Sequence, residues 1–510
     1  MGCRPVTESP RLARINGKTG GLDGLNIVVT GLGVSGFPAA VHLAERGASV
    51  IVVDSSSAEK FEDKINILSV FDAEVRLGPD AVLELPRFAD ALPDLVITSP
   101  GWRPDQPLLA QAAANAVPIW GEVELAWRLR GDNPAPWLVV TGTNGKTTVT
   151  SMLESMLQAA GLRALAAGNI GTPLVEAVLD DSYEVLAVEL SSFQLHWIHS
   201  MSAHSAVVLN IADDHADWHG SVDAYVADKA RIYQRVQKAG IYNEDDPRTR
   251  KMLEEADVVE GARAIGVTLA IPAPSQLGLV EDVLCDRAFI AERRTSAAEL
   301  GNVSDVAHAS GLPDDAEVPA HQIFNALAAA ALARSFGVPG GAIRDGLRSF
   351  TPGDHRIQTV AEADGVRWVN DSKATNPHAA LASLGSLRNI VWIAGGLAKG
   401  AKYDDLVGQV ADRLKAVVLI GVDTDPLSEA LSRHAPDVPL VVVPHDETGT
   451  KNATKRGENV MADAVRAAAQ LSQSGDTVIL APAAASMDQF DSYATRGDLF
   501  RDYARRHAEQ

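Results

Sequence analysis

Short apolar runs alternate with segments of helical periodicity along most of this chain. Near its beginning, residues 26–30, 48–53 and 95–98 form short continuous apolar runs, and residues 38–46 have the pattern of a helix that ends at Gly47. Buried strands that alternate with helices are typical of parallel sheets covered on both faces. The pattern therefore predicts an α/β fold with Rossmann-like, doubly wound sheets.

The middle of the chain continues this alternation. We predict strands at 137–140, 183–190 and 205–210, and helices at 147–160, 223–238 and 322–334. The helix at 147–160 carries apolar residues at i, i+3, i+4, i+7 and i+8, which form one helical face: Val149, Met152, Leu153, Met156 and Leu157. From 271 to 320 the pattern weakens, and there we expect short strands and loops.

The last part of the chain repeats the alternation a third time. Strands are predicted at 367–370, 389–394, 416–420, 440–443 and 477–480. Stretches rich in Pro and Gly, at 131–136 and 351–353, help to place the boundaries between domains. We predict a flexible N-terminal arm over 1–23 and three domains over 24–121, 122–351 and 352–510.

Composition narrows the possible classes of protein. Of 510 residues, 46% are hydrophobic and 22% are charged, so we expect a globular fold of about three domains. The 45 Lys and Arg against 66 Asp and Glu give a net charge of −21. This balance argues against a nucleic-acid partner, which requires a basic surface, but not against small anions held by a few local cations.

Cysteine use and the lack of long apolar runs indicate a soluble protein of a reducing compartment. Cys3 and Cys285 are too few and too far apart in the sequence for a disulfide framework or a zinc motif. No run approaches the ~20 apolar residues that span a bilayer. Residues 1–24 carry charges and lack the apolar centre of an export signal. We expect a cytoplasmic protein without membrane insertion.

The first glycine-rich loop, GLGVSG at 31–36, matches G-x-G-x-x-G between a predicted strand and a predicted helix. Such glycines let the backbone approach a diphosphate next to the positive end of the helix dipole. Asp54 ends the second strand, where its carboxylate could accept hydrogen bonds from ribose hydroxyls. The loop alone leaves three interpretations open: a dinucleotide site, another nucleoside-diphosphate site, or a tight turn without a ligand.

The second glycine-rich loop, TGTNGKTT at 141–148, also lies between a predicted strand and an amphipathic helix. It is a variant of the phosphate loop G-x-x-x-x-G-K-[ST], because Val140 stands where the general pattern has glycine. Backbone N–H groups of such a loop surround phosphate, Lys146 adds a positive charge, and Thr147 offers a hydroxyl to Mg²⁺. We predict that this loop binds a nucleoside triphosphate.

An acidic residue at the end of a neighbouring strand should complete the metal site of this loop. Glu189 lies near the end of the strand predicted at 183–190 and is the natural candidate. The alternative is a polar residue that only terminates the strand.

Both loops in one chain point away from a dehydrogenase and from a simple ATPase, because neither class uses both. Together with a third α/β stretch they resemble the Mur ligase family, the ATP-dependent amino-acid ligases of peptidoglycan precursor synthesis. The phosphate loop is that family's variant, which accounts for Val140. Further landmarks are Asn169, Asp213-Asp214-His215, Lys229, Asn325, His355-Arg356 and DSKATN at 371–376. The resemblance covers about residues 24–505.

Within the family, three features resemble the members that add D-glutamate. These are the GLGVSG loop, the DSKATN run, and APAAASMDQF at 481–490 followed by Arg496-Gly497. The Asn-Pro-Arg element of diaminopimelate-adding members is absent from the C-terminal part. The chain departs from the family pattern at Gln322, where Asn is frequent, and at Tyr493, where Phe is frequent.

The resemblance implies that the L-alanyl carboxylate of UDP-N-acetylmuramoyl-L-alanine takes the γ-phosphate of ATP, after which the amine of D-glutamate attacks the acyl phosphate. Because several anions meet, catalysis would depend on positioning and charge neutralisation. Two Mg²⁺ ions are implied, one near Thr147 and Glu189 and one near His215 and Lys229. Lys229 would be carbamylated by CO₂, which needs an amine with a lowered pKa; the alternative is a solvated helix lysine.

The resemblance also assigns the remaining site residues. Catalysis is expected from Lys146, His215 and Lys229, with His215 either a metal ligand or the acceptor of the amine proton. ATP would contact Gly142, Thr143, Asn144, Gly145, Lys146, Thr147, Thr148, Asn325, Arg356 and Asp371. The UDP substrate would contact Gly33, Ser35, Gly36, Asp54, Ser99, Gly101 and Asn169. D-Glutamate would contact Lys373, Thr375, Lys399, Ser486 and Tyr493, although the glycine loop around Lys399 could also be only a flexible turn.

Because the expected ATP contacts come from two domains, we predict hinge closure near 350–354. We also expect a monomer. Three other functions remain open: a family ligase with a different acceptor amino acid, a nicotinamide-dependent oxidoreductase that uses 31–36, and a nucleotide-binding protein without catalysis.

Overall fold

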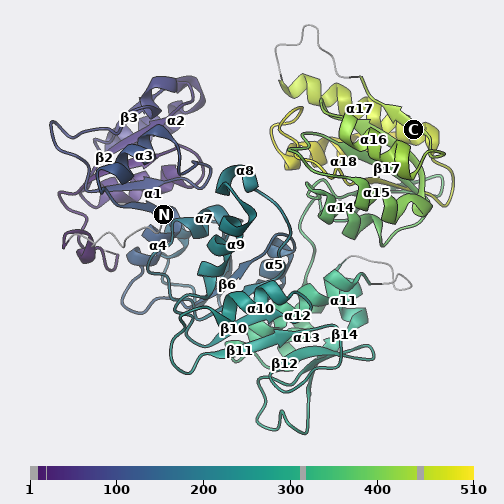
Figure 1. Ribbon diagram of the computed structural model, residues 1–510, viewed down its shortest axis with the longest axis horizontal. Coiled ribbons are helices and arrows are strands. Elements are labelled where there is room, and N and C mark those ends of the chain that lie inside the picture. Colours follow the sequence, from purple (N-terminus) through teal and green to yellow (C-terminus); the bar gives the residue numbers. More distant parts are fainter. Residues whose placement is uncertain (1–9, 19, 311–317, 445–452, 510) are drawn as a thin grey trace. The chain divides into compact units, whose positions relative to one another are not determined.

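The computed structural model describes residues 10–18, 20–310, 318–444 and 453–509 (Figure 1). The chain divides into two compact units. One unit comprises Met1–Asn302 and Phe324–Leu347, and the other comprises Val303–Ile323 and Arg348–Gln510. Both contain parallel strands that alternate with helices, so the predicted α/β class is confirmed. The described residues form three sheets, built from residues 26–121, 137–302 and 358–480.

The first sheet has five parallel strands in the order β3-β2-β1-β4-β5. The strands are β1 (Asn26–Thr30), β2 (Ser49–Asp54), β3 (Glu74–Leu77), β4 (Leu95–Thr98) and β5 (Ile119–Gly121). The helices are α1 (Gly36–Glu45), α2 (Glu62–Val70), α3 (Pro107–Ala114) and α4 (Glu122–Leu129). The strand order reverses between β1 and β4, which is the place where open α/β sheets bind ligands.

The described residues before β1 pack into the core of the larger unit, to which they belong. They form one turn, η1 (Leu12–Arg14), and the side chains of Leu12, Ile15 and Leu22 are at most 2% exposed. The described part of this segment therefore differs from the flexible arm predicted over 1–23, because its apolar residues join the core. Residues 1–9 lie outside the described residues.

The second sheet has nine strands in the order β14-β13-β12-β11-β10-β9-β6-β8-β7. Its strands are β6 (Trp137–Thr141), β7 (Ala164–Gly168), β8 (Val185–Glu189), β9 (Ser205–Val208), β10 (Ala239–Asn243), β11 (Arg263–Val267), β12 (Gln276–Val280), β13 (Val283–Asp286) and β14 (Ala298–Asn302). β6 pairs in parallel with β8 on one side and β9 on the other. Helix α5 (Lys146–Ala159) follows β6 and buries the predicted apolar face. The second glycine loop lies between them, at the carboxyl end of a central strand.

Two helices in this region differ from the prediction. The helix expected over 223–238 ends early, as α9 (Val222–Ala230) and the single turn η4 (Arg231–Tyr233). The hydroxyl of buried Tyr233 accepts from the backbone of β9 and donates to that of β10, and Arg235 has a φ of +57°, so the chain leaves the helix there. Helix α11 (Val303–Ala309) lies where only strands and loops were expected. Helix α12 (Ala320–Ser335) confirms the prediction at 322–334, and α13 (Gly340–Ser349) follows it.

The smaller unit contains a six-stranded sheet in the order β15-β16-β20-β17-β18-β19. The strands are β15 (Gln358–Ala363), β16 (Val366–Asn370), β17 (Ile390–Gly395), β18 (Leu414–Ile420), β19 (Leu440–Val442) and β20 (Thr477–Leu480). The helices around it are α14 (Pro377–Leu384), α15 (Asp404–Val410), α16 (Asp425–His434), α17 (Ala453–Leu471) and α18 (Tyr493–Ala508). β15 is antiparallel to β16, and the other strand pairs are parallel.

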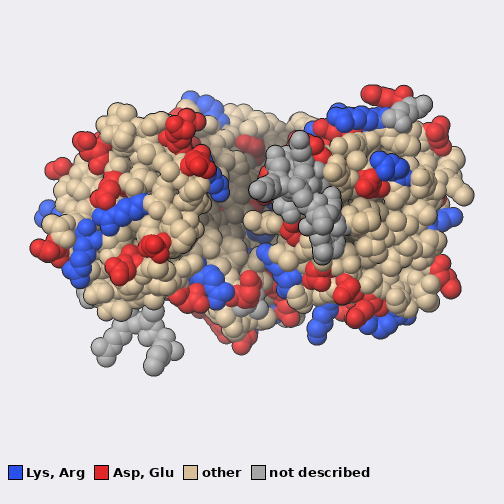
Figure 2. All heavy atoms as spheres, turned by 90° about the horizontal axis from the view of Figure 1, so that it is seen from above, with Lys and Arg blue, Asp and Glu red and all other residues tan. Residues whose placement is uncertain are grey.

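Apolar clusters cover both faces of this last sheet. Along β17, Ile390 and Trp392 belong to one cluster and Val391 and Ile393 to the other, as the alternation of side chains in a strand requires. Among the described residues, no helix is both long enough and apolar enough to cross a bilayer. On the face drawn in Figure 2, acidic and basic side chains are interspersed.

Candidate active site

The first glycine loop joins β1 to α1 where the strand order reverses. Gly31 has a φ of +87°, and a Cβ on Gly36 would overlap the carbonyl oxygen of Gly31, so the turn itself requires both glycines. A Cβ on Gly33 would meet nothing within 4 Å, and Gly33 is exposed. The packing of the protein does not explain Gly33, and a ligand that approaches the backbone would.

Asp54 and Ser99 hold this loop in shape. The two carboxylate oxygens of Asp54 accept from the N–H groups of Leu32 and Ser56, each at 2.8 Å. Burial opposes ionisation of Asp54, but these hydrogen bonds outweigh it and lower the pKa of the carboxyl. The Ser99 hydroxyl donates to the carbonyl oxygen of Thr30 at 2.7 Å.

Most residues predicted to contact the UDP substrate lie together. They lie at or just beyond the carboxyl ends of β1, β2 and β4: Gly33, Ser35, Gly36, Asp54, Ser99 and Gly101. Asn169 is the exception. It follows β7, an edge strand of the second sheet, and this sheet also carries the second glycine loop.

The second glycine loop joins β6 to α5. Gly142 and Gly145 have φ values of +157° and +85°, which favour glycine. The Lys146 Nζ donates to the carbonyl oxygens of Gly142 and Thr143, both at 2.9 Å, so the ammonium group lies directly over the loop. A Cβ on Gly145 would lie 2.6 Å from the Oδ1 of Asn325, which puts this residue of α12 beside the loop.

Glu189 lies next to this loop with one carboxylate oxygen unpaired. It ends β8, is paired in register with Val140 of β6, and is 1% exposed. Its Oε1 accepts from the Nδ2 of Asn169 at 2.8 Å, whereas its Oε2 is buried without a hydrogen-bond partner among the described residues. A buried carboxylate oxygen of this kind needs a cation or another partner. Glu189 and the hydroxyl of Thr147 therefore fit a Mg²⁺ site, since Mg²⁺ prefers oxygen ligands.

Lys229 is buried next to the same loop, on α9. Its side chain is 2% exposed, and its Nζ donates to the carbonyl oxygen of Gly142 at 2.9 Å and to the Thr141 hydroxyl at 3.4 Å. Burial, and then the charge of Lys146, lower the pKa of Lys229 well below the usual value, although Asp214 and Glu189 oppose the shift. The amine is thus a candidate for a neutral nucleophile, which a solvated helix lysine is not.

His215 adjoins this group. Its φ is +52°, and its ring packs on Phe193 with the ring centroids 4.7 Å apart. Burial lowers the pKa of His215; the Asp214 carboxylate opposes the shift and the charges of Lys146 and Lys229 add to it. A neutral imidazole can ligate a metal ion or accept a proton, so both predicted roles suit this environment.

Three side chains around the loop were missed from the sequence. Asn210 accepts from the N–H of Asn144 at 2.9 Å and donates to its carbonyl oxygen at 3.1 Å. The Tyr225 hydroxyl lies 2.8 Å from that of Thr143, and burial raises the pKa of this phenol above its usual range. Asp228 precedes Lys229 on α9, and hydrogen bonds from two histidines lower the pKa of its carboxyl to about 2 although burial opposes this. The sequence offered one signal for Tyr225: it lies four residues before Lys229, so both side chains lie on the same face of a helix.

The residues predicted for D-glutamate lie in the smaller unit. Lys373 and Thr375 follow β16, Lys399 follows β17, and Ser486 follows β20, so all four lie beyond the carboxyl ends of three adjacent strands. A β-bridge between Leu397 and Ala485 joins two of these loops. Tyr493 begins α18, and the Nζ of Lys373 lies 3.8 Å from its ring centroid.

Two further charged residues of this unit are buried. Asp371 follows β16, and burial raises the pKa of its carboxyl to about 7 although hydrogen bonds from Ser383 and the Ile357 N–H oppose the shift. Arg496, which was not among the predicted site residues, is 0% exposed and donates to the hydroxyl and carbonyl oxygen of Ser372 at 3.0 and 2.9 Å. The guanidinium thereby fixes the loop that carries Lys373.

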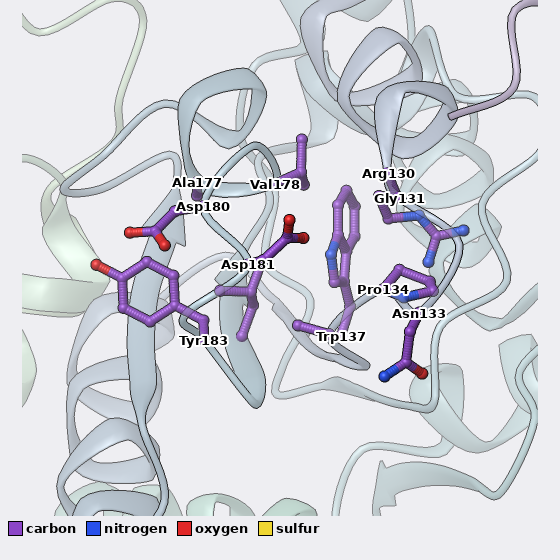
Figure 3. Close-up of a pocket in the computed structure, with 12 residues that line it drawn as sticks. Arg130, Gly131, Asn133, Pro134, Trp137, Ala177, Val178, Asp180, Asp181 and Tyr183 are labelled. Carbon is purple, nitrogen blue, oxygen red and sulfur yellow. The ribbon is translucent and has the colours of Figure 1, made fainter. Parts of the chain in front are cut away.

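A separate small cavity lies at the other end of β6 (Figure 3). Trp137, Arg130, Asp180, Asp181 and Tyr183 are among the residues that line it. Its volume of about 20 Å³ suits one water molecule and not a substrate. Because β6 begins at Trp137 and its carboxyl end leads into the glycine loop, this cavity is not part of the candidate active site.

Known proteins resemble the chain along its whole length. Residues 25–121 match the family description "Mur ligase MurD-like, N-terminal domain", 140–333 match "Mur ligase middle domain", and 355–484 match "Mur ligase, glutamate ligase domain". The chain is 54% identical over 484 residues to the UDP-N-acetylmuramoylalanine--D-glutamate ligase of Streptomyces avermitilis, with 94% of this chain and 98% of the relative covered. The chain belongs to the Mur ligase family. The resemblance inferred from its motifs is confirmed.

Further similar proteins also match nearly the whole chain. The protein of the same name from Mycolicibacterium smegmatis is 44% identical over 502 residues, with 94% of this chain and 96% of the relative covered. UDP-N-acetylmuramate-alanine ligase MurC from Thermotoga maritima has a TM-score of 0.54 at 18% identity, over 95% of this chain and all of the other. A pseudomurein peptide ligase type C from Methanothermus fervidus has a TM-score of 0.56 at 17% identity, over 95% and 100%. At these identities the solved structures support the fold alone.

Proposed function

We propose that this chain is an ATP-dependent ligase that joins D-glutamate to UDP-N-acetylmuramoyl-L-alanine in peptidoglycan precursor synthesis. Full-length relatives at 44–54% identity carry the name of that enzyme. The single observation in the structure that carries the proposal is the group around the phosphate loop: a buried lysine with a lowered pKa, Lys229, next to the partly unpaired carboxylate of Glu189.

The first half-reaction transfers phosphate to the substrate carboxylate. The backbone of 142–148 would surround the β- and γ-phosphates of ATP, and Lys146 would move from its two carbonyl partners to the phosphate oxygens. When bound, Mg²⁺ would neutralise phosphate charge; Thr147 and Glu189 would hold one ion, and His215 and Lys229 a second. Asn169 keeps Glu189 in place through its hydrogen bond of 2.8 Å.

Lys229 is proposed to carry a carbamate. The lone pair of its neutral Nζ would attack the carbon of CO₂, and one N–H proton would leave to solvent, so that a negative carbamate replaces the amine. Burial lowers the pKa of Lys229 and so supplies the neutral amine that this reaction needs. The nearest protein partner of the nitrogen, the Gly142 carbonyl, belongs to the phosphate loop, so the carbamate would lie close to ATP.

The second half-reaction needs an amine and a tetrahedral intermediate. Lys373, Thr375, Lys399 and Ser486 are proposed to hold the two carboxylates of D-glutamate, with Tyr493 against Lys373. Arg356 and Asp371 are proposed to contact ATP from the same unit. His215, with its lowered pKa, can accept the proton of the attacking amine or ligate metal.

The first sheet is proposed to bind the UDP group at Gly33, Ser35, Gly36, Asp54, Ser99 and Gly101. We further propose a cytoplasmic monomer.

A panel of acceptor amino acids tests the proposal. Purified protein with ATP, Mg²⁺, bicarbonate and UDP-N-acetylmuramoyl-L-alanine should release phosphate with D-glutamate and not with L-glutamate, L-lysine or diaminopimelate. Turnover with another amino acid alone would assign the chain a different acceptor. Tight NAD(H) binding without affinity for UDP would favour an oxidoreductase, and ATP binding without any turnover would favour a non-catalytic nucleotide-binding protein.

A further inference from the structure

Two imidazoles and one carboxylate form a cluster that no step above uses. His196 ends α7 (Ser192–His196), His219 ends α8 (Ala216–His219), and Asp228 lies on α9. The Nδ1 atoms of His196 and His219 lie 2.8 and 2.9 Å from the same oxygen, Oδ2 of Asp228. These three atoms lie within 4.8 Å of one another.

We propose that His196, His219 and Asp228 form a binding site for one divalent transition-metal ion of the zinc class, separate from the magnesium sites at the phosphate loop. Two imidazole nitrogens and one carboxylate oxygen are the donor set of three-ligand zinc sites, in which a solvent molecule takes the fourth position. Imidazole suits Zn²⁺, Co²⁺ and Ni²⁺, whereas Mg²⁺ prefers sites made of oxygen. The donor set therefore selects against the metal that accompanies ATP.

The surroundings of the cluster supply the outer contacts that metal ligands need. The second nitrogen of His219, Nε2, lies 3.0 Å from the hydroxyl of Ser192, and the ring stacks on Phe193 with centroids 5.5 Å apart. In the metal-bound form, Nε2–H of His219 would donate to Ser192, and the lone pair of Nδ1 would face the ion. The other oxygen of Asp228, Oδ1, lies 3.2 Å from Nε of Arg231. Such contacts fix the tautomer and orientation of ligands in metalloproteins.

Binding of a metal ion would displace the Nδ1 protons of His196 and His219. The present distances to Asp228 are those of hydrogen bonds from two Nδ1–H groups, and metal binding requires that neither imidazole carries a proton on Nδ1. The His196 side chain is 27% exposed, whereas His219 is fully enclosed and Asp228 is 7% exposed, so an ion would enter on the side of His196. A bound ion would join α7, α8 and α9 next to His215 and Lys229.

Cobalt titration of the full-length protein tests the site directly. The protein is first treated with a chelator, and Mg²⁺ with a non-hydrolysable ATP analogue is kept saturating to occupy the phosphate-loop sites. We expect one Co²⁺ per chain with visible d–d absorption of a nitrogen-ligated ion, and its displacement by Zn²⁺. His196→Ala should weaken Co²⁺ binding by more than about tenfold, since even the loss of an outer contact costs 10–100-fold.

Two variants separate this site from its alternatives. His434→Ala is the control. His434 lies 3.0 Å from Asp404 on the surface and forms a pair of one histidine and one carboxylate, so its loss should leave Co²⁺ affinity unchanged. His215→Ala should also retain the signal, because that residue belongs to the proposed magnesium site. Circular dichroism checks that each variant is folded, and none of these readouts requires ligase activity. Absence of Co²⁺ uptake by the wild type, equal affinity in wild type and His196→Ala, or loss of the signal in His215→Ala would overturn the proposal.

Discussion

Lys229 combines a long cationic side chain with a buried position beside backbone carbonyls. An ammonium ion there would pay a large desolvation penalty, and the nearby charge of Lys146 adds to it, so the pKa of Lys229 falls well below its usual value. The sequence indicated this position only as a landmark of the Mur ligase family. The burial itself depends on how α9 places Lys229 beside Thr141 and Gly142, more than 80 residues earlier in the chain, which no local pattern contains.

We predict that Lys229→Ala reduces ligation by at least about 100-fold, the scale of a removed electrostatic group in an active site. The reason is the loss of the proposed carbamate, and a short carboxylate such as acetate should restore part of the rate. Initial rates of phosphate release measure both effects. The matched control is Lys238→Ala, an exposed lysine outside the site, which should be fully active. Unimpaired activity of Lys229→Ala would remove the carbamate from the mechanism.

Asp371 should make the stability of the protein depend on pH. Its pKa is raised to about 7 by burial, so the folded state holds a proton that the unfolded state releases near pH 4. The stability contributed by the protonated acid is therefore lost as pH rises through about 7. Asp371→Asn resembles the protonated acid at every pH. We compare the melting temperature of this variant with that of wild type at pH 5.5 and at pH 8. The variant should gain several degrees over wild type between these two pH values. A difference that does not change with pH would contradict the raised pKa of Asp371.

At the scale of elements, the limits of the strands that were predicted are more accurate than those of the helices. β1, β4 and β20 were predicted to the residue, because continuous apolar runs bounded by polar residues leave little choice of limits. The helix after 223 was predicted too long, since its end depends on the Tyr233 hydroxyl reaching the backbone of two strands. Likewise, the pair Asn144 and Asn210 requires two strand ends to be adjacent, and periodicity does not show strand order.

The loop between β1 and α1 gives a prediction at this scale. Gly36→Ala should destabilise the protein by about 1–3 kcal/mol and raise the KM for the UDP substrate, because the new Cβ meets the Gly31 carbonyl. Thermal unfolding and steady-state kinetics measure the two effects. Gly33→Ala is the matched folding control, since nothing lies within 4 Å of its Cβ, and its melting temperature should not change. Equal melting temperatures for all three proteins would contradict the packing described for this turn.

At the scale of the whole molecule, the residues predicted to bind ATP and the amino acid come from both compact units. The phosphate loop, Glu189 and Lys229 belong to one, and Arg356, Asp371 and the proposed D-glutamate residues to the other. No helix or strand is present between α13 and β15, the stretch that contains 350–354. The alternation of elements predicted three α/β stretches, but the sequence contains no signal for their relative positions.

Hinge closure near 350–354 is the prediction that belongs to this scale. We expect the radius of gyration from small-angle X-ray scattering to fall when an ATP analogue, Mg²⁺ and UDP-N-acetylmuramoyl-L-alanine are added together. The fall should be absent in Lys146→Ala, which would lose its proposed contact with the phosphates. An unchanged radius in the wild type under saturating ligands would contradict closure.

The central claim is that ATP cleavage is coupled to amide formation with D-glutamate. The most direct measurement is the mass of the nucleotide-sugar product in a reaction of wild-type protein with UDP-N-acetylmuramoyl-L-alanine, ATP, Mg²⁺, bicarbonate and a single amino acid. We predict a product heavier by one glutamyl residue, with one ADP formed per product, when D-glutamate is supplied and not when L-glutamate is supplied. A product only with L-lysine or diaminopimelate, or ADP formation without any new product, would contradict the claim.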